Sequence, residues 1–191
     1  MAHAALPAEY GGPLQMVYCN DAERAYQVRV GLGLLPSVLV DFICNQGVQF
    51  AVLSRRSRPS RAIAEWYPER DDAGPTGGRR LFDEAAGWYD PRARLIAITR
   101  SSNPIRTVVH EVGHAIDHLL WQGSGFDVQR HYRRGRAVTP YGETNAAEFW
   151  AEAFRVVHHP GALAVDGREA AYRASPLLLE TIESLPQLIA R

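Results

Sequence analysis

The spacing of apolar and polar positions predicts a first part of the chain that mixes strands with helices. Short apolar runs at 14–19 and 48–53 predict strands, since both are brief and partly β-branched. Helical spacing of apolar residues follows Asp21 and resumes after Pro36, which predicts two helices between these strands. The first of these helices is expected to run towards Leu32.

A hairpin and a long amphipathic helix are predicted next. Gly87–Tyr89 and Arg94–Thr99 flank an Asp-Pro turn signal, and the second run is rich in strand-forming residues, so we expect the two to pair. Ser102 or Asn103 can cap the helix that follows, and a wide apolar stripe extends this helix to Leu120. The helix carries the residues with the clearest chemistry.

Beyond this helix the pattern predicts a polar loop and then helices only. The loop is expected from Gln122 to Tyr141. Its arginine-rich stretch at 130–136 is interpreted as solvated surface, although steering of an acidic substrate is a second interpretation. The helices are expected at 144–158, 169–174 and 176–190.

Together these elements predict the α+β fold class. The N-terminal half would hold a small mixed β-sheet with helices, and the C-terminal half would be all helical. A chain of 191 residues with 46% hydrophobic residues can bury a core without disulfides, so we expect one domain over residues 1–191. Subdomains of about 1–121 and 122–191 would flank a cleft.

Composition removes several classes of partner. The 21 basic residues balance 21 acidic ones, which favours neither a nucleic-acid nor a membrane partner. Cys19 and Cys44 lack metal-ligand spacing, so we expect two buried thiols, with one disulfide as the alternative. The first residues do not resemble a signal sequence, and no segment has the apolar length of a transmembrane helix. The location stays open between the cytoplasm and, if a signal was trimmed, secretion.

The strongest chemical signal is the H-E-x-x-H pattern formed by His110, Glu111 and His114 on the predicted helix. Residues four apart lie on one helix face about 6 Å from each other, so both imidazoles can reach one ion. A random chain of this composition would contain the pattern about 2% of the time. The motif therefore predicts a zinc site, with Glu111 beside the metal.

A catalytic zinc needs a third protein ligand, which leaves a fourth position for water. His118 is excluded by geometry, because eight helical residues place it about 12 Å along the axis from His110. Three acids compete for the role in the next long helical segment, namely Glu143, Glu148 and Glu152. The residue pattern alone leaves this choice open.

Two blocks of the chain resemble the zinc peptidases that share the catalytic domain of anthrax lethal factor, a group that includes the secreted Pro-Pro endopeptidases. The blocks are His-Glu-x-Gly-His-Ala-x-Asp at 110–117 and Tyr-Gly-x-Thr-Asn-x-Ala-Glu-Phe-x-Ala-Glu-Ala-Phe-Arg at 141–155. The resemblance implies a gluzincin-like fold, with Glu148 as third ligand of one Zn²⁺ ion and Tyr141 facing the reaction centre. It also implies that Glu152 orients a ligating histidine and that Asp117 has a supporting role.

The expected function is a zinc-dependent metalloendopeptidase in which Glu111 is the general base for a zinc-activated water. The Tyr141 hydroxyl would donate to the oxyanion. The alternative is a zinc-binding but inactive protein-interaction module. The presence of both Glu111 and Tyr141 argues against it, since neither is needed merely to hold a metal. The sequence does not say which bond is cut or whether proline is preferred there.

The expected partner is a peptide or protein substrate, and we expect a monomer. Substrates of such enzymes commonly lie extended along an edge strand beside the active helix, so either strand of the hairpin is expected to border the cleft. The candidate cleft residues are Trp88, Tyr89, Ile96 and Ile98. A core position is the rival interpretation for Trp88.

Overall fold

The computed structural model describes residues 16–56, 84–121, 128–159 and 165–190. Its strands are β1 (Met16–Cys19), β2 (Gln49–Val52), β3 (Gly87–Asp90) and β4 (Leu95–Ile98). Its helices are α1 (Ala22–Gly33), α2 (Ser37–Asn45), α5 (Pro104–Trp121), α6 (Val128–Arg134), α7 (Ala146–His158), α8 (Val165–Ala174) and α9 (Pro176–Ile189), with the 3₁₀ turn η1 (Tyr141–Glu143) before α7. The mixed α+β class is confirmed.

The four described strands form one mixed sheet in the order β1-β2-β4-β3. β1, β2 and β4 are parallel, and β3 runs antiparallel to β4 with Trp88 opposite Ala97. The predicted hairpin is therefore confirmed. Its turn is held by the Asp90 carboxylate, which accepts the backbone N–H groups of Arg92 at 2.8 Å and Ala93 at 3.1 Å. Within the described sheet, β3 lies at an edge and β4 lies inside.

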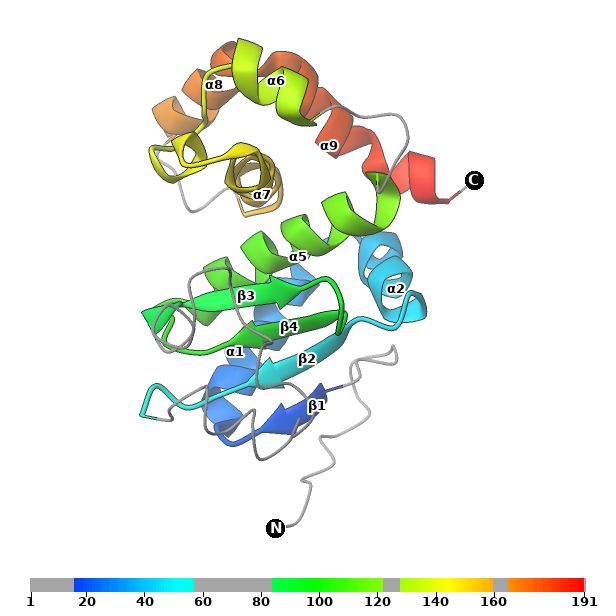
Figure 1. The fold of residues 1–191 in the computed structure, drawn as a ribbon, viewed down its shortest axis with the longest axis vertical. Helices are drawn as coiled ribbons and strands as arrows, with labels where there is room; N and C mark the ends of the chain where they lie inside the picture. The colour runs from blue at the N-terminus through cyan, green and yellow to red at the C-terminus, as the bar shows by residue number, and fades with distance from the viewer. Residues whose placement is uncertain (1–15, 57–83, 122–127, 160–164, 191) are drawn as a thin grey trace.

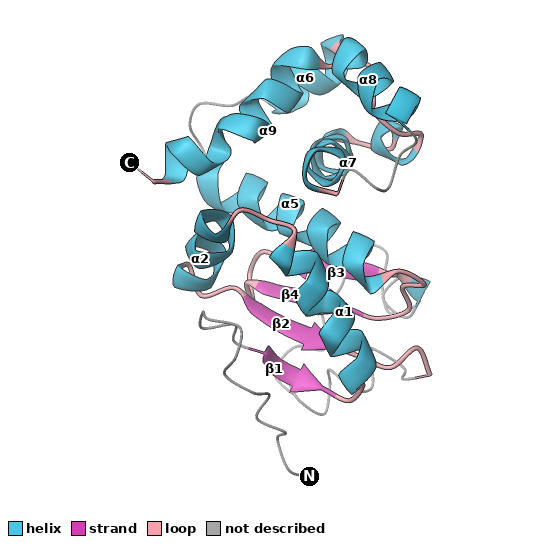
Figure 2. Cartoon of the chain, turned by 180° about the vertical axis from the view of Figure 1, so that it is seen from behind, coloured by secondary structure: helices cyan, strands magenta, loops and turns pink. Residues whose placement is uncertain are grey.

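Helices α1 and α5 cover one face of the sheet, as the two opposite views show (Figures 1 and 2). The side chains on this face belong to the main hydrophobic core, which continues through α2 to α7 and α9. The other face carries a smaller apolar cluster that includes Trp88 and Ala97. α5 therefore lies between the sheet and the C-terminal helices, where it contacts both.

The helix starts follow the predicted capping signals. The Asp21 carboxylate accepts the Arg24 N–H at 3.2 Å at the start of α1. Asn103, and not Ser102, supplies the side-chain cap of α5, where it accepts the Arg106 N–H at 3.0 Å. Each of these bonds satisfies a backbone donor that the helix itself leaves unpaired, which fixes where the helix begins.

The segment predicted as a loop from 122 to 141 contains the helix α6 in its described part, so that prediction is wrong there. α6 has no fully buried residue, and of its seven residues only Val128 and Tyr132 pack against the core, which is too few to form the wide apolar stripe by which a helix is recognised. The segment is held by hydrogen bonds, in which the Tyr132 hydroxyl donates to the Glu143 carbonyl and the Ser175 hydroxyl to the Arg136 carbonyl, both at 2.7 Å.

α5 and α7 pack closely against each other at Gly113. A Cβ atom at this position would lie 3.1 Å from the Ala151 Cα and 3.1 Å from the Phe154 Cβ, tighter than ordinary side-chain contacts. The Trp150 indole N–H donates to the Gly113 carbonyl at 2.8 Å and fixes the register of the two helices. The absence of a side chain at residue 113 thus allows the two helices to lie within reach of a shared site.

None of the helices in the described ranges is, on its own, both long enough and apolar enough to cross a membrane. The pair formed by α1 and α2, bent by 115° at its break, meets the length and composition criteria only when taken together. The proposed division of the chain at about residue 121 stays a prediction.

Candidate metal centre and active site

Three side chains from two helices converge between α5 and α7. His110 and His114 lie one turn apart on α5, and Glu148 projects from the first turn of α7. The His110 Nε2 is 3.2 Å from the His114 Nε2 and 3.0 Å from the Glu148 Oε2, and the His114 Nε2 is 3.5 Å from the same oxygen. All three side chains are largely but not fully buried, with 11 to 18% of their surface exposed.

The chemistry of these atoms fits a divalent metal. The His110 Nδ1 faces the Glu152 carboxylate at 2.9 Å, so in the neutral ring the proton lies on Nδ1 and the Nε2 lone pair is directed at the cluster. Two ring nitrogens and a carboxylate oxygen this close together are stabilised by a positive charge among them, which a proton or a metal ion can supply. Four ligands of a tetrahedral zinc lie about 3.3 Å apart, close to the separations between the three donor atoms here.

The electrostatics of the cluster also favour a cation. Burial opposes the charged form of His110, but hydrogen bonds to Glu148 and Glu152 outweigh it and raise the pKa of His110 to about 9. Burial likewise opposes ionisation of Glu148, yet its bonds to His110 and His114 lower the pKa of Glu148 to about 2. The carboxylate is therefore available as an anionic ligand at neutral pH.

Glu152 lies behind His110 at the centre of a buried hydrogen-bond network. Its carboxylate accepts the His110 Nδ1–H, the Thr139 hydroxyl at 2.6 Å, and the Arg155 Nε and Nη2 groups at 2.9 and 2.8 Å. Both Glu152 and Arg155 are almost completely buried, at 2% and 1% exposed. Burial opposes ionisation of Glu152, but the bonds from Arg155, His110 and Thr139 outweigh it and hold its pKa well below the usual range. These contacts are compatible with the role that the sequence resemblance implies for Glu152, which stays a prediction.

Glu111 follows His110 on α5 and lies near the cluster, between it and the edge strand β3. The residue is 5% exposed, and its carboxylate accepts the backbone N–H of Tyr89. A Cβ atom at Gly87 would lie only 3.1 Å from the Glu111 Oε1, so the strand backbone passes directly against the acid. Burial raises the pKa of Glu111, an effect opposed by the nearby charges of His114 and His110. A raised carboxyl pKa is suited to a group that takes up and releases a proton near neutral pH.

Tyr141 stands at the solvent side of the same cluster. It lies on η1, its side chain is exposed, and its ring centre is 5.8 Å from that of His110. Partial burial and the negative charges of Glu148, Glu111 and Glu152 raise the pKa of Tyr141 to about 12. The phenol therefore keeps its proton at neutral pH and can donate a hydrogen bond.

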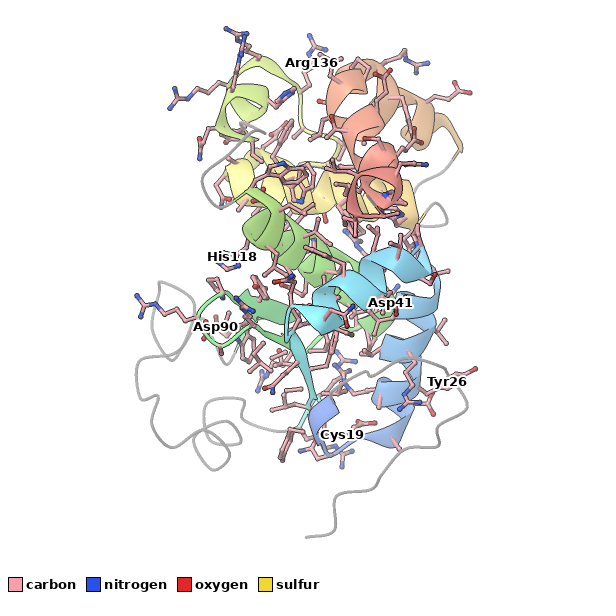
Figure 3. All side chains as sticks on the ribbon, turned by 90° about the vertical axis from the view of Figure 1, so that its right-hand side faces the viewer. Cys19, Tyr26, Asp41, Asp90, His118 and Arg136 are labelled. Carbon is pink, nitrogen blue, oxygen red and sulfur yellow. The ribbon has the colours of Figure 1, made fainter. Side chains whose placement is uncertain are left out.

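The remaining sequence candidates for metal ligation are separated from the cluster in the described structure. Glu143 is exposed on η1, and its backbone carbonyl accepts the Tyr132 hydroxyl. His118 has its Nδ1 3.0 Å from the Tyr89 hydroxyl, beside the turn that carries Asp90 (Figure 3). Among the described residues, the group able to hold a metal consists of His110, His114 and Glu148.

Asp117 lies three residues after His114 on α5 and is half-buried. Burial raises the pKa of Asp117 to about 6, and the nearby charge of His114 opposes this rise. The proximity to His114 is compatible with the supporting role that the sequence resemblance implies, which stays a prediction.

Three of the four cleft candidates are wrongly placed by the sequence. Ile96 and Ile98 lie on the inner strand β4, fully buried in the core that includes α5, because the hairpin adds β3 outside them. Trp88 is 8% exposed and belongs to the apolar cluster on the opposite face of the sheet, as the rival interpretation expected. Tyr89 alone of the four lies on the α5 side of the edge strand, where it contacts His118 and Glu111.

Sequence reasoning missed Thr139, which lies within the segment predicted as a loop, and it did not use Gly87 or Arg155. Arg155 is the last residue of the second motif block, so its place in the block that carries the family resemblance was a usable signal. Nothing local marks Thr139 or Gly87, because their contacts are with residues 13 and 24 positions away along the chain.

Comparisons with known proteins bear on the fold and on the sequence resemblance. No family model matches the chain. Lethal factor of Bacillus anthracis is 30% identical over 115 residues, a match that covers 50% of this chain but only 13% of lethal factor. The solved structure of a Pro-Pro endopeptidase from Paenibacillus alvei superposes with a TM-score of 0.62 at 19% identity, covering 89% of this chain and 96% of that one. The chain thus resembles lethal factor in sequence and the Pro-Pro endopeptidase in fold, which confirms the resemblance predicted from its two motif blocks.

Proposed function

We propose that the chain is a zinc-dependent endopeptidase. The observation that carries the proposal is the convergence of His110, His114 and Glu148, with their donor atoms 3.0 to 3.5 Å apart, next to the buried acid Glu111. The donor set of two imidazoles and one carboxylate is typical of catalytic zinc sites that keep a fourth position open. The proposal is supported by a relative and a fold neighbour that are named lethal factor and Pro-Pro endopeptidase.

In this proposal the three ligands would hold one zinc ion, which when bound supplies a Lewis acid and lowers the pKa of water towards about 7. Glu111 would take the proton from the attacking water at its carboxylate and deliver it to the leaving amine. Its position supports this role, because the Tyr89 N–H fixes one side of the carboxylate and burial raises its pKa. Glu152 would hold the His110 ring in place through Nδ1.

Tyr141 would donate its hydroxyl proton in a hydrogen bond to the carbonyl oxygen of the substrate as negative charge builds on it. Its exposure and its pKa of about 12 support this role, since the phenol is both accessible and protonated. The strand β3, which lies at the edge of the sheet that the described residues form, would present its outer side to an extended peptide, as edge strands do in β-augmentation. A preference for proline at the cut bond belongs to the proposal, supported only by the name of the fold neighbour.

The test is a comparison of Glu111→Gln, Glu148→Ala and the control Glu143→Gln, whose side chain is exposed outside the metal cluster. Zinc content would be measured by elemental analysis, and cleavage of a combinatorial peptide library by mass spectrometry with and without a chelator. Glu111→Gln should retain zinc and lose about a hundredfold or more in cleavage. Glu148→Ala should lose the metal, and Glu143→Gln should behave as the wild type.

Two results would count against the proposal. Full activity of Glu111→Gln would remove the general-base assignment. A wild-type chain that holds zinc but cleaves no peptide in the library would instead support the alternative of an inactive zinc-binding module. Cleavage sites without enrichment of proline would remove the proline preference and leave the peptidase proposal in place.

A further inference from the structure

Thr139 lies between Glu152, which contacts His110, and the turn that carries Tyr141. It belongs to the stretch that leads from α6 into η1, and its side chain is partly buried. The hydroxyl donates to the Glu152 Oε2 at 2.6 Å. The Thr139 Oγ1 also accepts the backbone N–H of Gly142, the residue directly after Tyr141, at 3.2 Å. One hydroxyl group therefore contacts both the carboxylate behind His110 and the turn that carries Tyr141.

The bond to Glu152 is the stronger of the two. A hydroxyl that donates to an ionised carboxylate at this distance forms a charge-assisted bond, about twice as strong as a bond between neutral groups. The Glu152 carboxylate also accepts the Arg155 Nε and Nη2 groups at 2.9 and 2.8 Å, and Glu152 is 2% exposed, so water has little access to replace the hydroxyl. Loss of the hydroxyl would leave one lone pair of a buried anion without its donor.

The bond to Gly142 fixes the turn. The Gly142 N–H also donates to the Thr139 carbonyl at 3.1 Å, so residue 139 holds the start of η1 by both its side chain and its backbone. A Cβ atom at Gly142 would lie 3.6 Å from the Glu152 Cβ and 3.4 Å from the Phe149 Cα, which shows that the turn rests on α7. Tyr141 is exposed, so its orientation is set by this turn together with the hydrogen bond between its side chain and Glu148.

The other described anchors of the segment point away from the metal cluster. The Arg136 carbonyl accepts a bond from Ser175 at the start of α9, and Arg136 itself lies at the outer side of the C-terminal helices (Figure 3). The Tyr132 hydroxyl joins α6 to the Glu143 carbonyl. The first bond joins the segment to α9, and the second joins α6 to η1. Thr139, in contrast, joins the segment to Glu152, the carboxylate that contacts the proposed metal ligand His110.

We propose that Thr139 is a positioning residue that joins the orientation of His110 and the placement of Tyr141 through Glu152. The inference rests on the proposed function for the roles of His110 and Tyr141. It goes beyond that function because it assigns a joint role to a residue outside both motif blocks. Removal of the hydroxyl should weaken metal retention and lower turnover together.

The experiment compares Thr139→Val, which removes the hydroxyl at nearly constant volume, with Thr139→Ser, which keeps it. The zinc dissociation constant would be measured by competition with a chromogenic chelator, and kcat and KM with a peptide found by the library screen. We expect Thr139→Val to weaken zinc binding about tenfold or more, as is typical for partners of ligating histidines. Its kcat should fall about tenfold at saturating zinc, with KM little changed, because a positioning residue acts on the reacting geometry.

Thr139→Ser should restore both zinc affinity and kcat to within about threefold of the wild type, since the hydroxyl is the acting group. Circular dichroism and thermal melting would show that the variants fold, and Thr139→Ala replaces Thr139→Val if the latter does not. Equal losses in the valine and serine variants would overturn the inference, because a purely structural role depends on the lost volume and not on the hydroxyl.

A double-mutant cycle with Tyr141→Phe tests the link to the turn. If Thr139 acts on turnover by placing the phenol, Thr139→Val should cost less in kcat once the phenol is gone. Fully additive losses would overturn that part of the inference. Wild-type zinc affinity and kcat in Thr139→Val would overturn the whole inference while the proposed peptidase stands. Failure of the wild type to bind zinc would remove both, and a zinc-binding but inactive wild type would still allow the affinity measurement to decide.

Discussion

Replacement of Gly87 by alanine should test how closely the edge strand constrains the proposed general base. A Cβ atom at residue 87 would lie 2.6 Å from the Thr107 Cγ2, 3.0 Å from the Ala97 carbonyl oxygen and 3.1 Å from the Glu111 Oε1. The first separation is shorter than real side-chain contacts allow, so a neighbour has to move. Thr107 cannot rotate freely, because its hydroxyl is bonded to the Ser101 hydroxyl at 2.6 Å and to the Asn103 carbonyl at 3.1 Å.

The magnitude follows from two opposing effects. Overpacking of a tight site costs about 1–3 kcal/mol, whereas alanine reduces the freedom of the unfolded chain and contributes about 0.4–1 kcal/mol of stability. The net loss in the free energy of unfolding should be roughly 1–2 kcal/mol. Turnover should fall about tenfold, because displacement of a catalytic group by even a fraction of an ångström is costly and the new methyl group presses on the Glu111 carboxylate.

The matched control is the double variant Gly87→Ala with Thr107→Ser, which removes the clashing methyl and keeps the hydroxyl bonds. Urea unfolding and peptide cleavage at saturating zinc would be measured for both variants. The double variant should recover most of the stability but only part of the turnover, because the close approach to Glu111 remains. Wild-type stability and turnover in Gly87→Ala alone would refute the steric reasoning.

Two further predictions concern stability. Arg24 is 6% exposed and donates to the backbone carbonyls of Leu53 and Ser101, each at 2.9 Å, and to that of Thr99. Because Arg24→Met would leave these buried carbonyls without a donor, it should lower the free energy of unfolding, measured in urea, by about 3 kcal/mol or more. Arg24→Lys should recover only part of this loss, and full recovery would contradict the role of the guanidinium fork. Burial lowers the pKa of His158 to about 4. As the pH falls from about 6.5 towards 4, the unfolded chain takes up a proton on His158 and the folded chain does not, so the free energy of unfolding of the metal-free protein should decrease over this range. His158→Leu should flatten the stability curve in this range, and parallel curves for variant and wild type would show that another group is responsible.

The elements that sequence predicted best are those whose signals are local. The α5 helix follows from an apolar stripe and from the Asn103 cap, and the hairpin follows from its turn residues. The strand order could not be predicted in the same way. A hairpin signal says that two strands pair, but it does not say which of them gains a second neighbour. Ile96 and Ile98 were therefore assigned to the cleft although β2 covers their strand on its other side.

The residues of the site also differ in whether a local signal predicts them. The spacing of His110 and His114 within one helix is enough to predict that they meet. The choice of Glu148 over Glu143 and Glu152 came only from the sequence resemblance, because it depends on how α7 crosses α5. Thr139 could not be found from the sequence, since the carboxylate that it contacts lies on a helix whose position no local pattern gives. The helix α6, which precedes Thr139 in the chain, was missed because only two of its residues, Val128 and Tyr132, pack against the core.

The close contact at Gly113 has a consequence for judging other chains that carry the same motif. The donor atoms from α5 and α7 meet only while the two helices stay close together, and they lie close at Gly113, where a side chain is absent. A methyl group at residue 113 would push α5 and α7 apart by a few tenths of an ångström. The donor atoms on the two helices would then separate, although every ligand would still be present in the sequence. The spacer residue between the histidines is thus as informative as the ligands themselves.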